Sequence, residues 1–314
     1  MEGSNLVASQ DYLVSKLTIR HFVGEAGCLL LARALQTQNK TQATRGKVLR
    51  YNKLKWKITG EIMSGKNILY EKRNNAAIIK FNRPEKKNAL SLELMEELRG
   101  VLESVENDDD VRAVVITGVG NAFSSGADLS DVQTFQMMEQ QLDASSGKST
   151  MIKLINLEKP TIAAVNGYAL GHGLECALMC DIIIASDKAV FGFIGPLRGS
   201  ICPYAMIRLA DEVGRAKAKE LLFTCDRISA KEALKIGLIN KVVPHEKLMD
   251  AAFEIVERMK NSAPLATKLT KQGINRELGG YEYSLKAFRE IAAGGDIMEG
   301  ALAFLEKRQP KWSK

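Results

Sequence analysis

Residues 167–184, with the sequence GYALGHGLECALMCDIII, combine three glycines, one glutamate and an apolar run that reaches an aspartate, Asp181. Glycine has no β-carbon, so a ligand can approach the backbone of this stretch closely. Amide N–H groups at a helix start have no partner within the helix and can bind a negatively charged oxygen. A carbonyl oxygen developing into an enolate would fit there, with Glu175 beside it as a candidate acid or base. A second interpretation is equally open from this stretch alone. The glycines would only permit a strand to pack tightly on a helix, and Glu175 would be a solvated helix residue.

Two other chemistries are weaker interpretations of the same residues. GHGLEC matches only two glycines of the dinucleotide fingerprint, although Asp187 lies at a suitable distance for a ribose. A P-loop is excluded because no Gly-Lys-Ser/Thr is present. His172, Cys176 and Cys180 share one helix face and could serve a metal or thiol site. No further His or Cys cluster completes a ligand set, so we predict two buried, packed cysteines and no metal site.

Strand and helix patterns alternate on both sides of this stretch. NILYEKR and AAIIKFN flank Asn74-Asn75 and predict a hairpin, and the helical spacing after Ser91 predicts a helix capped by that serine. VRAVVITG, TIAAVNG and DIIIASD predict strands, and residues 129–157 are expected to be largely helical. This alternation implies right-handed crossovers and a mainly parallel sheet. From Pro203 onward the pattern is helical apart from NKVV, which predicts an α/β core followed by a helical region.

Positive charge is concentrated in the first part of the chain. The 314 residues have a formal net charge of +7, and residues 1–62 hold ten Lys or Arg against four Asp or Glu, which accounts for +6 of it. Because the remainder is nearly neutral, a dedicated nucleic-acid surface is not expected. No apolar run is long enough and uncharged enough to predict a membrane span. The five cysteines are odd in number and lie in apolar contexts, which favours a reducing compartment.

Residues 1–62 form a basic N-terminal extension that lacks regular amphipathic patterning. Three explanations stay open: a targeting presequence, a disordered tail, or a translated leader upstream of the true start. We favour the leader, because an ordinary domain begins at Met63. A cytoplasmic location follows, whereas a genuine presequence would direct the chain to the mitochondrial matrix.

Five motifs together resemble one family. RPEKKNALS, NAFSSGADL, KPTIAAVNGYALGHGLECALMCDI, LLFTCDRISAKEALKIGLINKVV and EGALAFLEKRQPKW occur in the order of the crotonase (enoyl-CoA hydratase/isomerase) superfamily, over about residues 65–313. The resemblance implies an α/β fold with a crotonase-like spiral ββα core over 63–255 and a helical C-terminal trimerisation region over 256–314. It also implies homo-trimers or hexamers and an acyl-CoA substrate, with coenzyme A as part of the thioester and no tightly bound cofactor.

The resemblance also assigns roles around the glycine stretch. The family's two oxyanion-hole amides fall on Ala127 and on His172, where the family usually has glycine. Glu175 falls on the first catalytic glutamate of the hydratases. The second glutamate is missing, because its position reads Gly195, or Pro196 if a gap is shifted. The substrate-lining positions implied by these loops are Gly126, Asp128, Gly171 and Gly195.

Contacts to coenzyme A are implied at both ends of the domain. Phe304 and Lys307 fall where the family contacts the adenine and the phosphate, often from a neighbouring subunit. Lys86 and Lys87, in the early loop RPEKKNAL, border the same ligand as weaker candidates. Ser130 stands where several hydratases carry a phosphate-binding lysine, which weakens that contact.

The expected activity is therefore enoyl-CoA hydration, in which one glutamate acts as both acid and base. Isomerisation, decarboxylation or thioester hydrolysis on the same fold are the alternatives, because a one-base proton shift or enolate chemistry needs no second carboxylate. A homologue without turnover that only binds acyl-CoA or RNA is the alternative of another class. The missing glutamate favours it, and the retained Glu175 opposes it.

Overall fold

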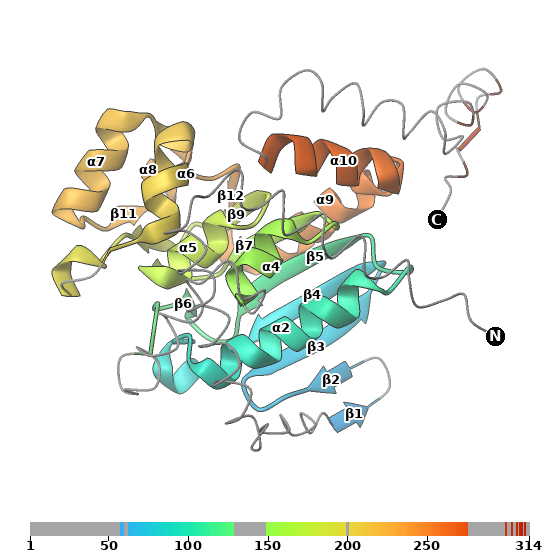
Figure 1. Cartoon of the computed structure of the whole chain (residues 1–314), viewed down its shortest axis with the longest axis horizontal. Helices are drawn as coiled ribbons and strands as arrows, with labels where there is room; N and C mark the ends of the chain where they lie inside the picture. Colours follow the sequence, from blue (N-terminus) through green and yellow to red (C-terminus); the bar gives the residue numbers. More distant parts are fainter. Residues whose placement is uncertain are drawn as a thin grey trace, which may run out of the picture. The chain divides into compact units, whose positions relative to one another are not determined.

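The computed structural model describes residues 57–59, 62–128, 149–198 and 201–275, with single positions from 299 to 311. By its contacts the chain divides into two units, Met1–Lys53 and Leu54–Lys314. All elements described below belong to the second and are drawn in Figure 1. Among the described helices, none has the length and apolar composition that a membrane span requires.

The larger sheet of the described region has eight strands in the order β1-β2-β3-β4-β5-β7-β9-β12. Strands β1 to β4 pair antiparallel, and β4, β5, β7, β9 and β12 pair in parallel, which confirms the predicted mainly parallel core. The strands are β1 (Lys57–Thr59), β2 (Ile62–Ser64), β3 (Ile68–Arg73), β4 (Ala76–Phe81), β5 (Ala113–Gly118), β7 (Thr161–Val165), β9 (Ile182–Ser186) and β12 (Lys241–Val243).

The predicted hairpin joins β3 to β4. Asn74 and Asn75 have φ angles of 53° and 61°, and Arg73 pairs with Ala76 across the turn. Two consecutive left-handed residues are what a tight two-residue hairpin turn requires, and asparagine tolerates that conformation.

A second sheet has the order β11-β10-β8-β6 and is built from short strands. Its members are β6 (Ala122–Ser124), β8 (Tyr168–Leu170), β10 (Val190–Gly192) and β11 (Ile228–Ser229). From β5 to β10, successive strands alternate between the two sheets, so the chain advances as a spiral. The sequence analysis missed β8, which interrupts the glycine stretch, and β11, because strands of three and two residues carry no periodic signal.

The central strands β4, β5 and β7 of the larger sheet are buried on both faces. Ala76 and Ile78 of β4 pack in a cluster with helix α9 (Leu248–Met259), whereas Ala77 and Ile79 face the cluster that contains α2 (Leu92–Glu106), α4 (Thr150–Asn156) and α5 (His172–Leu178). Burial on both faces explains the continuous apolar run in this strand. The N-cap of α2 is Ser91, as predicted, and its Oγ accepts a hydrogen bond from Leu94 N at 3.3 Å.

Between β10 and residue 275 the described chain is mainly helical, as expected. Its α-helices are α6 (Pro203–Val213), α7 (Arg215–Thr224), α8 (Ala230–Lys235), α9 and α10 (Pro264–Asn275). The hairpin of β1 and β2 crosses the expected boundary at residue 62, and α9 crosses the one at residue 255. The domain limits themselves stay predictions.

Candidate active site

Glu175 lies inside the short helix α5 and is 1% exposed. This burial excludes the interpretation of Glu175 as a solvated helix residue. A buried carboxylate is costly unless it has polar partners, and Glu175 has three of them.

Two partners of Glu175 are backbone amides at the start of α6. Oε1 accepts hydrogen bonds from Tyr204 N at 2.8 Å and from Ala205 N at 3.1 Å. Because these amides lie in the first turn after Pro203, they have no partner within the helix, and the positive end of the helix dipole faces the carboxylate. The third partner is the imidazole of His172, whose Nδ1 lies 3.0 Å from Oε2. The three contacts hold the carboxylate in one orientation.

The loop that follows β6 lies against the first turn of α5. A β-carbon on Gly126 would lie 2.9 Å from the carbonyl oxygen of Leu170 and 3.4 Å from the amide nitrogen of His172. A β-carbon on Gly173 would lie 2.5 Å from the carbonyl oxygen of Ser124. The two shortest of these distances are closer than a side chain allows, so both glycines are needed for the contact.

Ala127 and His172, the two residues predicted to bind an oxyanion, have amides that local pairing does not use. Leu90 forms a single parallel bridge with Ala127, in which Leu90 N donates to Gly126 O at 2.8 Å and Asp128 N donates to Leu90 O at 3.1 Å. The bonded groups therefore belong to the neighbours of Ala127, and its own amide faces away from Leu90. His172 is the first residue of α5, where the amide has no partner within the helix.

Asp128 joins the early loop to the loop after β6. Its buried Oδ2 lies 2.8 Å from Arg83 Nη2 and 3.3 Å from Lys86 Nζ. Lys87 adopts a left-handed conformation with φ of 50°, and its Nζ lies 5.1 Å from the ring centroid of Tyr168. The structure thus brings Asp128, Lys86 and Lys87 together, while their contacts to substrate stay predictions.

Gly195, one of the two positions predicted for the missing second glutamate, lies against a neighbouring thiol. A β-carbon on Gly195 would lie 3.0 Å from Cys202 Sγ and 3.1 Å from the carbonyl oxygen of Ile201. Burial, and secondly the charge of Glu175, raises the pKa of Cys202 to about 11. Near neutral pH this thiol is protonated and is not a nucleophile.

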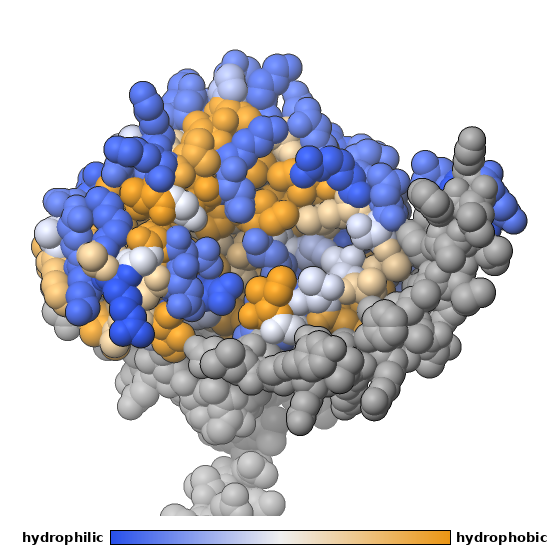
Figure 2. All heavy atoms as spheres, turned by 90° about the horizontal axis from the view of Figure 1, so that it is seen from above, coloured by the Kyte–Doolittle hydropathy of each residue, from blue (hydrophilic) through white to orange (hydrophobic). Residues whose placement is uncertain are grey.

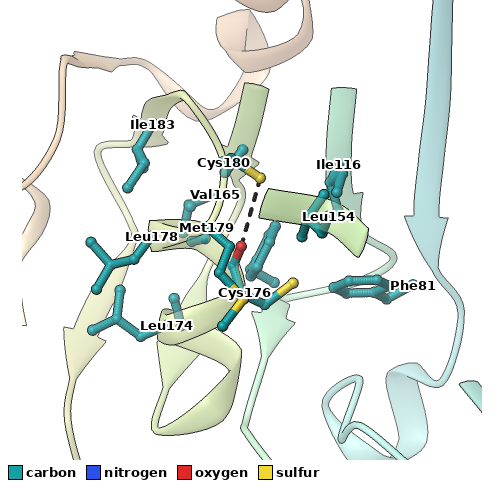
Figure 3. Close-up of a cluster of buried hydrophobic side chains, with 14 of the residues drawn as sticks. Phe81, Ile116, Leu154, Val165, Leu174, Cys176, Leu178, Met179, Cys180 and Ile183 are labelled. Atoms are coloured by element: carbon teal, nitrogen blue, oxygen red, sulfur yellow. Dashed lines mark hydrogen bonds between the residues drawn. The ribbon is translucent and has the colours of Figure 1, made fainter. Parts of the chain in front are cut away.

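Cys176 and Cys180 pack in the core, which confirms the prediction made for them. Figure 3 shows them among apolar side chains that include Leu154, Leu174 and Ile183, with Cys180 Sγ 3.6 Å from the carbonyl oxygen of Cys176. Burial raises the pKa of Cys176 to about 12, and it raises that of Cys180 well above its ordinary value. Neither thiol is ionised near neutral pH.

Three predicted residues cannot be placed in the site, and two contacts within the site were not predicted. Phe304, Lys307 and Ser130 lie outside the described residues. The contact of Glu175 with the start of α6 was missed, although Pro203 is a typical first helical residue and could have predicted where that helix begins. The bond between the His172 ring and Glu175 was also missed, because spacing along the chain does not fix a rotamer.

A parallel sheet whose strands alternate with a second, smaller sheet is the crotonase fold. An enoyl-CoA hydratase from Bacillus anthracis has a crystal structure that matches with a TM-score of 0.71 at 36% sequence identity, covering 79% of this chain and 99% of that one. The chain belongs to the enoyl-CoA hydratase/isomerase family, whose model matches residues 71–314.

Two relatives are similar over nearly their whole length. The short-chain-enoyl-CoA hydratase of Clostridium acetobutylicum is 41% identical over 252 residues, which cover 77% of this chain and 96% of the relative. The crotonyl-CoA hydratase of Syntrophomonas wolfei is 38% identical over 256 residues, which cover 79% and 98%.

Proposed function

We propose that the protein is an enoyl-CoA hydratase, a lyase that adds water across the α,β double bond of an acyl-CoA thioester. The observation that carries the proposal is the buried carboxylate of Glu175, fixed one turn after the free amide of His172. The similarity to relatives named as hydratases supports the same activity.

In the proposed mechanism the thioester oxygen accepts hydrogen bonds from the amides of Ala127 and His172. When water adds to C3, electrons of the double bond move toward this oxygen and form an enolate, which the two amides stabilise. Removing one such donor typically costs about 10²- to 10³-fold in rate. Both donors are backbone groups, so the histidine at position 172 leaves the oxyanion hole intact.

Glu175 is the proposed acid and base of the addition. A carboxylate beside C2 and C3 can take a proton from water and return it to C2 in the same turnover. A specific observation also favours isomerisation as a second candidate, because Cys202 fills the space beside Gly195 where a second carboxylate would begin. A proton shift between C2 and C4 needs one base only.

We also propose binding of the coenzyme A portion by Lys86, Lys87, Phe304 and Lys307, without a tightly bound cofactor.

We further propose that the protein assembles as a homo-trimer or hexamer. Figure 2 shows hydrophobic surface between hydrophilic side chains, and large apolar side chains are exposed on α6, α7 and α10, with Phe223 75% and Ile274 66% exposed. Surfaces of this kind favour association.

We propose a cytoplasmic location, which the four described cysteines support because they are free and buried.

The test is consumption of crotonyl-CoA, followed by loss of the enoyl absorbance and by the mass of the 3-hydroxyacyl product. Glu175→Gln keeps the shape of the side chain and is expected to lower kcat about 10²- to 10⁴-fold. Glu257→Gln, on the exposed side of α9, is the control and leaves kcat unchanged. If 2-enoyl thioesters of every chain length survive while a 3-enoyl thioester is isomerised, the hydratase proposal is replaced by the isomerase.

A further inference from the structure

The side chain of His172 is bonded to the carboxylate that the proposed mechanism uses. Its Nδ1 lies 3.0 Å from Glu175 Oε2, and the other carboxylate oxygen is held by two amides of α6. The amides do not exchange protons during catalysis. Of the groups bonded to Glu175 in the described part of the chain, the imidazole is therefore the one that can carry a proton.

The same contact fixes which ring nitrogen is available to a ligand. Because Nδ1 faces a carboxylate oxygen that accepts hydrogen bonds, Nδ1 carries the hydrogen of the neutral ring and Nε2 carries the lone pair. Nε2 has no hydrogen-bond partner among the described residues. The His172 side chain is 20% exposed against 2% for Glu175, so the ring is the more accessible member of the pair.

We propose that the imidazole of His172 is the group that exchanges the proton with the substrate, working as a pair with Glu175. The inference rests on the proposed hydratase function and supplies the group that Gly195 does not. A carboxylate on Nδ1 orients an imidazole and stabilises the imidazolium that forms when Nε2 takes a proton, as in the Ser-His-Asp triad.

The step balances with water as the co-reactant. Nε2 removes a proton from water, the water oxygen bonds to C3, and the electrons of the C2–C3 double bond move to the thioester as an enolate. The imidazolium then returns the proton to C2, which regenerates the neutral ring and completes the addition of one water molecule. In this step the proton exchange assigned above to Glu175 passes to the ring, and the carboxylate orients the ring and stabilises the imidazolium.

Two substitutions separate this role from a merely structural one. His172→Gly removes the ring but keeps the backbone amide. His172→Asn can still donate to Glu175 but has no basic nitrogen. We expect both variants to bind the saturated thioester butyryl-CoA as wild type does and to lose about 10²- to 10⁴-fold in kcat on crotonyl-CoA. Added free imidazole is expected to restore part of kcat in His172→Gly alone, because only glycine leaves room for the ring.

His245→Asn is the matched control. This imidazole belongs to η5 (His245–Lys247), and its Nδ1 lies 3.0 Å from Ser186 Oγ rather than beside Glu175. Its loss is expected to leave kcat unchanged. Wild-type kcat in His172→Gly or in His172→Asn overturns the inference and leaves the hydratase function standing. A wild-type enzyme that hydrates no enoyl-CoA overturns both.

Discussion

Gly195 lies close to Cys202 and Ile201, and this constrains what a substitution at position 195 can achieve. A side chain on Gly195 would begin 3.0 Å from Cys202 Sγ and 3.1 Å from the backbone of Ile201. A side chain at this position, where the family resemblance places the second carboxylate, would need these neighbours to shift. The chemistry of the site therefore depends on Glu175 and on what is bonded to it.

Restoring a glutamate at this position is predicted to fail. We expect Gly195→Glu to leave kcat on crotonyl-CoA no higher than in wild type and to lower the free energy of unfolding by about 1–3 kcal/mol, because the new side chain overpacks the site. Chemical denaturation and steady-state kinetics measure the two effects. Adding Cys202→Ala removes the thiol from the clash and is expected to recover part of the lost stability. A stable single variant with a higher kcat would contradict this account of position 195.

At the scale of elements, one ion pair between a buried lysine and a partly exposed aspartate holds α10 against the sheet. Lys271 Nζ lies 2.8 Å from Asp181 Oδ2, with the side chains 7% and 22% exposed. It also donates to Lys159 O at 3.0 Å, while Asp181 accepts from Thr161 N at 2.7 Å. The helix is thus tied to the residues that start β7 and β9.

Lys271→Met is predicted to lower the free energy of unfolding by about 2–4 kcal/mol, because it leaves Asp181 charged and partly buried without its partner. Lys268→Met on the same helix is the control. Lys268 pairs with Glu158 at 2.7 Å, but the side chains are 32% and 44% exposed, and such a pair contributes about 0–1 kcal/mol. Equal midpoints for the two variants in urea denaturation would contradict the assigned role of Lys271.

The sequence predicted the elements whose cause is local. Asn74-Asn75 supplies two left-handed residues, and Ser91 caps the helix that follows it, so both features could be found from residue type and spacing. Strand β8 was not predictable in this way, because its three residues pair with strands on either side rather than follow a pattern. The bonds from Tyr204 and Ala205 to Glu175 join residues 29 and 30 positions apart, and only the folded chain brings them together.

At the scale of the whole molecule, the site is assembled where the spiral brings distant segments side by side. Leu90 bonds the loop at Gly126, that loop contacts the start of α5, and the start of α6 holds Glu175. The family resemblance anticipated Ala127, His172 and Glu175 as a group. It did not reach the pairing of the His172 ring with Glu175, because glycine usually stands at position 172.

The N-terminal limit of the working enzyme is the last prediction. The second compact unit begins at Leu54, and β1 pairs with β2 from Lys57 opposite Ser64. Every residue that we assign to the site lies after β4, so a chain that begins at Leu54 is expected to retain kcat within about twofold and to unfold at the same temperature. A chain that begins at Met63 lacks β1 and the first residue of β2, Ile62, and leaves the rest of β2 unpaired at that edge. Its Tm is expected to fall by about 2–4 °C for each kcal/mol lost, with kcat preserved. The mass of the native protein tests whether Met63 is the true start. Loss of activity in the chain that begins at Leu54 would instead give residues 1–53 a part in catalysis.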